Sequence, residues 1–242
     1  MSDKLAEIIA HKKKEIEPLL LRADKLRYAA LERNEFRSLA SAIDLGGEKL
    51  GLIAEVKKAS PSAGIIAEDF DPVMQAKKYA SAGASAISVL TDEKYFSGRL
   101  DYLVKIRQEV EVPVLRKDFI IDEAQIYEAS VAGADAILLI VAALDQDDLK
   151  RLLDCAFTYQ LEVLMEVHDL RELERALETD VQIIGVNNRN LKTLETSINT
   201  SVKLSKILSP HKYPLICESG IHSIKEIKFP DSNLDLIVIK SS

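Results

Sequence analysis

The sequence predicts an α/β fold, a (β/α)8 TIM barrel with an N-terminal helical extension, and two observations carry this prediction. Eight short apolar runs alternate with segments that carry helix start signals, and eight is the number of strands that closes such a barrel. Two near copies, AGASAI at residues 82–87 and AGADAI at 132–137, each place a helix-ending glycine just before an apolar run. Their spacing gives each strand and its helix about 25 residues. An open, doubly wound parallel sheet is the alternative that the same pattern allows.

The first 48 residues differ from the rest because their apolar residues recur at helical spacing. Pro18 interrupts this pattern, and a second helical stretch is predicted over residues 26–43, ended by the glycine pair at 46–47. We therefore expect an N-terminal helical extension over residues 1–48 and a barrel over residues 49–242. The apolar positions of the first helix are Leu5, Ile8, Ile9, Ile16 and Leu19.

The eight apolar runs are the predicted strands, and they are nearly continuous, as strands buried on both faces of a parallel sheet are. They span residues 52–56, 86–90, 112–115, 136–141, 163–167, 183–186, 214–217 and 234–239. Helix N-cap signals lie between them at Asp71 before Pro72, Asp122 with Gln125, Asp145 with Asp148, Asp169, and Ser223 with Glu226.

The last predicted strand ends close to Ser242, and no helical stretch follows it in this sequence. We therefore expect the final covering helix to be absent, so that the outward side chains of residues 234–239 form an uncovered seam. A second copy of the chain or the N-terminal extension would cover that seam.

The charge and hydropathy of the chain argue against several classes of binding partner. Lys and Arg number 32 against 39 Asp and Glu, which gives a net charge of -7 at pH 7 and a pI near 5.3. This balance argues against binding nucleic acid or an anionic membrane. No apolar run approaches the roughly 18 residues of a membrane span, and no signal-peptide region is present, so we expect a cytoplasmic protein. The lysine run at residues 12–14 is expected to be a solvated helix face.

No metal or nucleotide motif is apparent. Cys155 and Cys217 lack disulfide or zinc spacing and are expected to be reduced, and the four histidines, at 11, 168, 211 and 222, do not cluster. No G-x-G-x-x-G follows a strand and no P-loop occurs, which disfavours nucleotide chemistry. We therefore expect a mechanism without metal or cofactor.

Polar residues follow the predicted strands at the end where barrel enzymes carry their active sites. Each alone is typical of a solvated rim, but Glu55 and Glu166 interrupt apolar runs, where burial without partners would be costly. A carboxylate and an ammonium held together there are a plausible base and acid. Ser219 and Gly220 suit a phosphate site, although an ordinary turn is equally compatible. The polar residues are Glu55, Lys57, Ser60, Lys117, Asp118, Glu166, Asn187, Asn188, Arg189, Asn190, Glu218 and Ser219.

The motifs at these strand ends resemble those of the indole-3-glycerol phosphate synthase family, in the same order and over essentially the whole chain. They read IAEVKKASPS at 53–62, LTD at 90–92 with YFSG at 95–98, RKDF at 116–119, MEV at 165–167, GVNNR at 185–189 and ESGI at 218–221. A helical N-terminal extension is also a feature of that family. The first motif is specific to it among phosphate-binding barrels.

The resemblance implies a carboxy-lyase of tryptophan biosynthesis that needs no metal or cofactor and is a monomer. It would convert 1-(2-carboxyphenylamino)-1-deoxyribulose 5-phosphate into indole-3-glycerol phosphate, carbon dioxide and water. By this likeness Lys117 is the general acid at the substrate carbonyl, Glu166 the general base for dehydration, and Glu55 the stabiliser of the cationic intermediate. Lys57 would hold Glu55 and the substrate carboxylate, while Asn187 and Glu218 would contact the substrate hydroxyls or the closing ring.

The same likeness assigns the substrate-binding residues. Phe96 would pack on the aromatic ring and Arg189 would lie near the anthranilate carboxylate. Ser60, Ser219, Gly220 and Ser241 would help to hold the phosphate. This chain has Lys240 where the family usually has a glycine whose amide approaches the phosphate. Two other functions stay open: a sugar-phosphate isomerase or aldolase on the same barrel, and a catalytically weakened barrel that binds a sugar phosphate.

Overall fold

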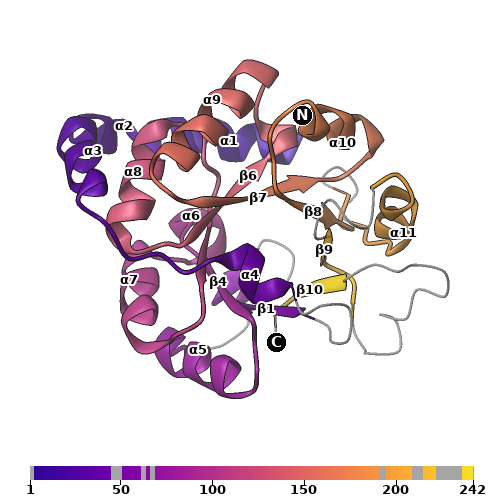
Figure 1. Cartoon of the computed structure of the whole chain (residues 1–242), viewed down its shortest axis with the longest axis horizontal. Coiled ribbons are helices and arrows are strands. Elements are labelled where there is room, and N and C mark those ends of the chain that lie inside the picture. Colours follow the sequence, from indigo (N-terminus) through magenta and orange to yellow (C-terminus); the bar gives the residue numbers. More distant parts are fainter. Residues whose placement is uncertain are drawn as a thin grey trace.

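The computed structural model describes residues 3–44, 51–60, 64–65, 69–190, 195–208, 215–221 and 236–241 (Figure 1). Its barrel strands are β1 (Gly51–Val56), β4 (Ala86–Leu90), β5 (Val114–Lys117), β6 (Ala136–Ile140), β7 (Glu162–Val167), β8 (Ile183–Asn187), β9 (Leu215–Glu218) and β10 (Leu236–Ser241). They pair in parallel from β4 through β5, β6, β7, β8 and β9 to β10. Because β1 pairs with β4 at one edge and with β10 at the other, the sheet closes into a barrel. This closure separates the barrel from the open sheet that the sequence also allowed.

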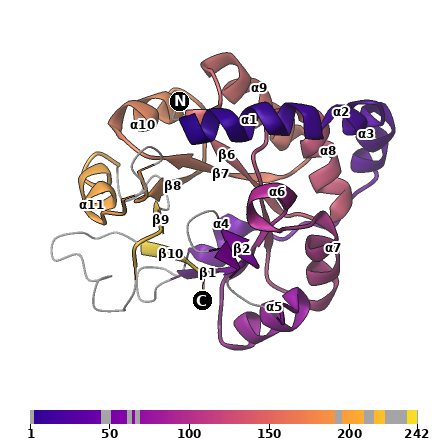
Figure 2. The ribbon, with the colours of Figure 1, turned by 180° about the vertical axis from the view of Figure 1, so that it is seen from behind.

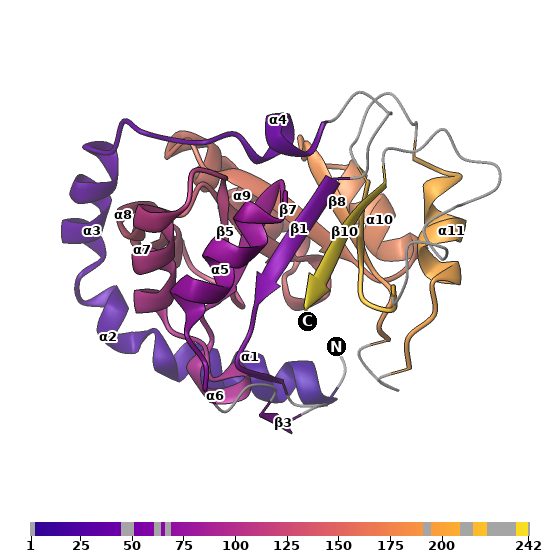
Figure 3. The same cartoon turned by 90° about the horizontal axis from the view of Figure 1, so that it is seen from below.

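Helices lie outside the barrel strands, as Figures 1 and 3 show. They are α5 (Pro72–Ser81), α6 (Glu93–Phe96), α7 (Leu100–Glu109), α8 (Glu123–Ala132), α9 (Gln146–Thr158), α10 (Leu170–Leu177) and α11 (Asn199–Ser205), with a 3-10 turn η1 (Val141–Ala143). The predicted N-caps are confirmed at Asp71, Asp122, Asp145 and Asp169, and Asp122 forms a full capping box with Gln125. Ser223 and Glu226 lie outside the described residues. No described helix is long and apolar enough to cross a membrane.

The apolar core has two parts because side chains alternate along each strand. One set of strand side chains, including Ile87, Ile137 and Val163, packs outward against the helices. The other set, including Ile53 and Leu164, fills the barrel interior. The strands are therefore buried on both faces, which explains their continuous apolar runs.

Four helices precede the barrel: α1 (Asp3–Glu15), α2 (Glu17–Leu20), α3 (Ala23–Leu31) and α4 (Leu39–Ile43). Helix α1 crosses the end of the barrel toward which the strands point, and α4 lies at the opposite end (Figure 3). The expected interruption at Pro18 is confirmed, because α1 ends at Glu15 and Pro18 stands in the first turn of α2. The glycine pair at 46–47 lies outside the described residues.

The single helix predicted over residues 26–43 is wrong. The chain leaves helical structure after Leu31 and re-enters it at α4, which Ser38 caps by accepting a hydrogen bond from the Ser41 amide. The reason is a tertiary contact: the buried carboxylate of Asp135 accepts from the backbone amide of Arg37 at 3.1 Å and from the Arg33 guanidinium at 2.9 Å. An amide that donates to this carboxylate is not part of a helical ladder.

Several strands run further than their apolar residues predict. The third predicted strand, at 112–115, is found two residues later, and β8 and β9 each continue one residue beyond the predicted end. The added residues are Arg116, Lys117, Asn187 and Glu218, which are polar but find partners inside the protein. A prediction from hydrophobicity alone therefore places the ends of these strands too early in the sequence.

The predicted uncovered seam concerns the outward side chains of β10. Those side chains and residues 222–235 lie outside the described residues, so the seam and the absent final helix stay predictions.

Candidate active site

Four charged side chains share the interior of the barrel at the end toward which the strands point. Each stands two positions after an apolar interior residue, so the alternation of the strand turns it inward. The three carboxylates are almost wholly buried and the lysine is largely so. The pairs are Ile53 and Glu55 on β1, Leu115 and Lys117 on β5, Leu164 and Glu166 on β7, and Ile216 and Glu218 on β9.

A continuous chain of ion pairs links most of the predicted catalytic residues. The Nζ atom of Lys57 lies 2.7 Å from Oε1 of Glu55, and the other oxygen of Glu55 lies 3.2 Å from Nζ of Lys117. That ammonium also donates to Oε2 of Glu218 at 2.8 Å. Residues from the ends of three strands that are far apart in sequence thus meet in the barrel mouth, as the strand-end pattern predicts.

The ion pairs fix the protonation of Lys117 and Glu55. Burial alone would lower the pKa of Lys117, but the carboxylates of Glu218, Glu55 and Glu166 outweigh it and raise the pKa above its usual value. Burial would raise the pKa of Glu55, but the two lysines outweigh that effect and lower it. Lys117 is therefore a charged proton donor, and Glu55 is a fixed negative charge beside it.

The other two carboxylates differ in their neighbours. Burial would raise the pKa of Glu166, yet the imidazole of His168, whose Nε2 lies 3.2 Å away, outweighs it and lowers the pKa. Burial and the neighbouring Glu166 raise the pKa of Glu218, although Lys117 opposes them. The site therefore holds one carboxylate that stays ionised and one that binds a proton more readily. Such a division is typical of acid–base sites.

Gly185 makes room for this carboxylate arrangement. A Cβ atom added at Gly185 on β8 would lie 2.5 Å from Oε1 of Glu218, so any larger residue would displace that side chain. Asn187, two residues further on, pairs in register with Glu218 and approaches Glu166 closely enough to lower its pKa. The predicted site residues Asn187, Glu166 and Glu218 are therefore neighbours.

The predicted substrate-binding residues Phe96, Arg189, Ser219 and Gly220 lie on segments that follow barrel strands. Phe96 is half-buried at the end of α6, and its ring centroid lies 6.2 Å from that of Phe119. The amide of Arg189 donates to the Asn187 side chain at 3.1 Å. Ser219 and Gly220 follow β9 with positive φ angles of 65° and 80°, and a Cβ at Gly220 would lie 2.5 Å from Thr196.

Three further positions are known only by their backbone. Ser241 pairs in register with Glu55 and Lys240 with Ala54 on the neighbouring strand, while Ser60 belongs to the short ribbon of β2 (Ala59–Ser60) and β3 (Gly64–Ile65). Their side chains lie outside the described residues, so their predicted contacts with phosphate stay predictions.

A cleft of about 730 Å³ is lined mainly by polar residues that follow β6, β7 and β8. Asn187 is the predicted catalytic residue that lines it, together with His168 and with Leu5 of α1. Within the described ranges, no group of three or more His, Cys, Asp and Glu side chains is arranged to hold a metal ion. The cleft has the size and polarity for a small polar molecule.

Comparison with known proteins matches the chain to one family along most of its length. The family model described as indole-3-glycerol phosphate synthase matches residues 5–239. A protein of that name from Chlorobium limicola is 44% identical over 238 residues, which is 97% of this chain and 92% of that protein. One from Acetivibrio thermocellus is 50% identical over 191 residues, or 78% of this chain and 73% of that protein.

The chain belongs to the indole-3-glycerol phosphate synthase family. Two solved structures with the same fold are much less similar in sequence. KGPDC from Streptococcus mutans has a TM-score of 0.57 at 11% identity, covering 80% of this chain and 88% of that one. The N-acetylmannosamine-6-phosphate 2-epimerase from Clostridium perfringens has a TM-score of 0.60 at 13% identity, covering 86% and 92%. These two likenesses concern the fold alone.

For this member of the indole-3-glycerol phosphate synthase family, sequence reasoning missed His168. Its ring lies between two carboxylates, with Nδ1 at 2.9 Å from Glu172 and Nε2 at 3.2 Å from Glu166. Burial would lower the pKa of His168, but these carboxylates raise it to about 10. The available signal was the acidic residue four positions later, on the first turn of α10, which reaches back to the ring.

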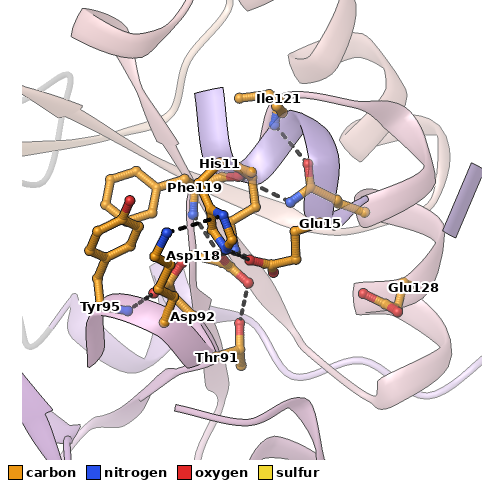
Figure 4. Close-up of polar contacts among 12 residues, drawn as sticks. His11, Glu15, Thr91, Asp92, Tyr95, Asp118, Phe119, Ile121 and Glu128 are labelled. Atoms are coloured by element: carbon orange, nitrogen blue, oxygen red, sulfur yellow. Dashed lines mark hydrogen bonds and ion pairs between the residues drawn. The ribbon is translucent and has the colours of Figure 1, made fainter. Parts of the chain in front are cut away.

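The expectation that lysines 12–14 form a solvated face is wrong for one of them. Lys13 and Lys14 are exposed, but the side chain of Lys12 is 0% exposed and contacts the carboxylates of Asp92 and Asp118. These two aspartates follow β4 and β5. Figure 4 shows both aspartates close to His11 and Glu15 of α1. Lys12 differs from Lys13 and Lys14 only because it lies on the face of α1 that meets the barrel.

Proposed function

We propose that this chain closes the indole ring of indole-3-glycerol phosphate, starting from 1-(2-carboxyphenylamino)-1-deoxyribulose 5-phosphate and releasing carbon dioxide and water. The observation that carries this proposal is the chain of ion pairs from Lys57 through Glu55 and Lys117 to Glu218. Family membership supports the reaction, and the ion pairs supply an acid and a negative charge where the reaction needs them.

Ring closure requires a proton at the ketone. The ring carbon that bears the carboxylate attacks the ketone carbon, and the ketone oxygen then takes a proton and becomes a hydroxyl. Lys117 is the charged donor for this proton, because nearby carboxylates hold its pKa high. The attacking aromatic system becomes cationic, and Glu55 supplies the negative charge that stabilises it. Loss of carbon dioxide leaves its electron pair in the ring and restores aromaticity.

Dehydration completes the indole. The new hydroxyl leaves as water after accepting a proton, and the neighbouring methylene carbon loses a proton to form the ring double bond. Glu166 is the base in this proposal, because it is ionised and contacts Asn187, which lines the cleft. Glu218 and Asn187 contact the hydroxyls or the closing ring, and the raised pKa of Glu218 suits it to exchange protons with Lys117.

The remaining residues bind the substrate. Phe96 packs on the aromatic ring, and Arg189 and Lys57 face the anthranilate carboxylate. The phosphate binds near Ser219 and Gly220, with Ser60 and Ser241. The positive φ angles at 219 and 220 support this assignment because they turn the chain sharply after β9, at the usual phosphate-binding end of such barrels.

We also propose that residues 49–242 form a TIM barrel and residues 1–48 a helical extension of it. We propose a cytoplasmic location, which suits a phosphorylated substrate that does not cross membranes. We propose that the chain is a monomer in solution. If the outward face of β10 is uncovered, as the sequence predicts, a second copy of the chain covers it.

The direct test is a turnover assay with the anthranilate-bearing substrate, in which the indole product is detected by its fluorescence. We expect turnover with this substrate and none with aminoaldose phosphates that lack the aromatic ring. Binding without turnover would support the weakened barrel instead. Turnover of the ring-free sugar phosphates would support the isomerase or aldolase.

A further inference from the structure

We propose that Lys12 is a positioning residue: it ties helix α1 to the segments after β4 and β5, and so sets the aromatic side chains on these segments and the proton donor Lys117, which directly precedes the second one. This inference rests on the proposed function, since it concerns the same site. It begins from the burial of the Lys12 ammonium, which lies among three carboxylates from three segments. These are Glu15 at 2.7 Å, Asp92 at 2.9 Å and Asp118 at 2.9 Å.

A buried ammonium of this kind needs a reason. Desolvating charges usually cancels much of the Coulomb attraction between them, so a buried ion pair is better evidence for a specified geometry than for added stability. Burial lowers the pKa of Lys12, but Asp118 and Asp92 outweigh it and raise the pKa. Lys12 is therefore charged, and its contacts fix the distance between α1 and both aspartates.

The first of these aspartates organises the loop after β4. Oδ1 of Asp92 accepts from the Tyr95 amide at 2.7 Å and caps α6, while its backbone carbonyl accepts from the Gly98 amide at 2.8 Å. Lys12 contacts the other carboxylate oxygen of Asp92. The Lys12 ammonium thus contacts Asp92, the residue that caps the short helix α6 ending at Phe96.

The second aspartate stands next to the proposed acid. Asp118 follows Lys117 directly, and its Oδ1 accepts from the Phe119 amide at 2.8 Å. Its Oδ2 accepts from the Thr91 hydroxyl at 2.6 Å and from Arg116 at 3.2 Å. Burial raises the pKa of Asp118, but Arg116 and Lys12 outweigh it and lower the pKa to about 2.

The two loops also meet each other, so their positions are coupled. Phe96 from the first loop and Phe119 from the second lie with ring centroids 6.2 Å apart. Phe119 follows Lys117 by two residues. A shift of α1 that moves both aspartates would therefore change the aromatic contact and the placement of the proton donor together.

Helix α1 makes further contacts with the same loop, which shows that the docking is extended. The Tyr95 hydroxyl donates to Glu7 at 3.1 Å, and the ring of His11 packs edge-on against that of Tyr95 (Figure 4). These contacts are exposed and so contribute little each. They orient α1 on the loop, whereas Lys12 reaches the buried aspartates.

The test compares Lys12→Met with Lys13→Met. Both substitutions remove one lysine charge from adjacent positions on α1, but Lys13 is exposed. We expect Lys12→Met to lower kcat/KM by about ten- to hundredfold, because small misplacements of reacting groups have effects of this size. We expect Lys13→Met to stay within about twofold, as is usual for a surface substitution.

Hydrogen exchange supplies a readout that does not depend on turnover. In Lys12→Met we expect faster exchange over residues 91–98 and 118–121, with the strands β6 and β7 unchanged. Turnover of the unmodified chain is measured first. If it is absent, the proposed function fails, while the exchange comparison still decides whether Lys12 holds the loops.

A second variant guards against a folding defect. In Lys12→Met/Asp92→Asn the asparagine keeps the cap on α6 and removes one of the uncompensated buried charges. We expect this double variant to recover part of the lost kcat/KM and of the exchange protection. A folded Lys12→Met variant with kcat/KM within twofold and unchanged exchange overturns the proposal. If neither variant folds, Lys12 serves stability, and the positioning role is equally overturned.

Discussion

The two ends of the barrel are built from the same strands but have opposite interiors. At the end where the strands begin, Leu39 and Ile43 of α4 are buried against apolar side chains such as Ile53 and Leu164. At the end where they finish, the interior is a linked set of carboxylates and ammonium groups. Figure 2 views the barrel from this end, with α1 in front of the strands. Two positions along a strand separate the apolar from the charged interior. We infer that one end mainly stabilises the fold and the other mainly performs chemistry.

The largest expected effect comes from removing the proposed acid. Lys117→Met takes away the proton donor and leaves Glu55 and Glu218 without their shared cation. We expect kcat/KM to fall by about 10² to 10⁴ while the fold persists. Steady-state kinetics and circular dichroism measure this, with Lys105→Met on the exposed face of α7 as the matched control. Activity within threefold of the parent would remove Lys117 from the role.

The proposed base gives a second test of the charged end. Glu166→Gln keeps the shape of the side chain but removes its charge and basicity, so we expect a loss of about 10² to 10⁴ in kcat/KM. We also expect the pH dependence of the rate to change, because the charge of Glu166 helps to raise the pKa of Glu218 and would be lost. Glu178→Gln, an exposed position after α10, is the control. A kcat/KM value within threefold of the parent would exclude Glu166 as the base.

The apolar end should respond in the opposite way. Leu39→Ala removes a fully buried side chain of α4 at the apolar end of the barrel, and we expect the free energy of unfolding to fall by about 2 to 5 kcal/mol. The turnover number of the folded fraction should be nearly unchanged. Urea unfolding and active-site kinetics on the same sample measure both, and Leu31→Ala, which is 56% exposed, is the control. A tenfold lower turnover in folded Leu39→Ala would mean that the two ends are not separable.

The smallest expected effect is a pH-dependent one at His168. Its pKa is raised to about 10 in the folded chain, against about 6.5 for an unfolded histidine. The stabilisation from its charge is therefore fully present below about pH 6.5 and is lost as the pH rises through about 10. We expect the difference in unfolding free energy between the parent and His168→Gln to shrink over that interval. A difference that stays constant would show that His168 is not charged in the fold.

Sequence patterns predicted those parts of the fold that depend on neighbours in the chain. The positions of most strands, the N-caps at Asp122 and Asp145, and the break at Pro18 follow from local periodicity and capping chemistry. The convergence of charged residues at one mouth followed from topology, because parallel strands bring their ends together. Local signals are enough for these features.

What the sequence did not predict depends on tertiary contacts. Residues 26–43 carry a helical pattern, but the amide of Arg37 and the guanidinium of Arg33 donate hydrogen bonds to Asp135, and the helix is interrupted there. The burial of Lys12 depends on two aspartates that lie some 80 and 106 positions later. Periodicity identifies which face of a helix is apolar, but it does not identify what that face meets.

The closure of the barrel has a consequence for the newly synthesised chain. Ile53 on β1 pairs with Ala86 on one side and with Ile239 on the other, so the second partner leaves the ribosome long after the first. Until residues 236–241 emerge, β1 and β9 are open sheet edges able to pair with other chains. The six residues of β10 therefore close the sheet and end the period in which these two edges can pair with other chains.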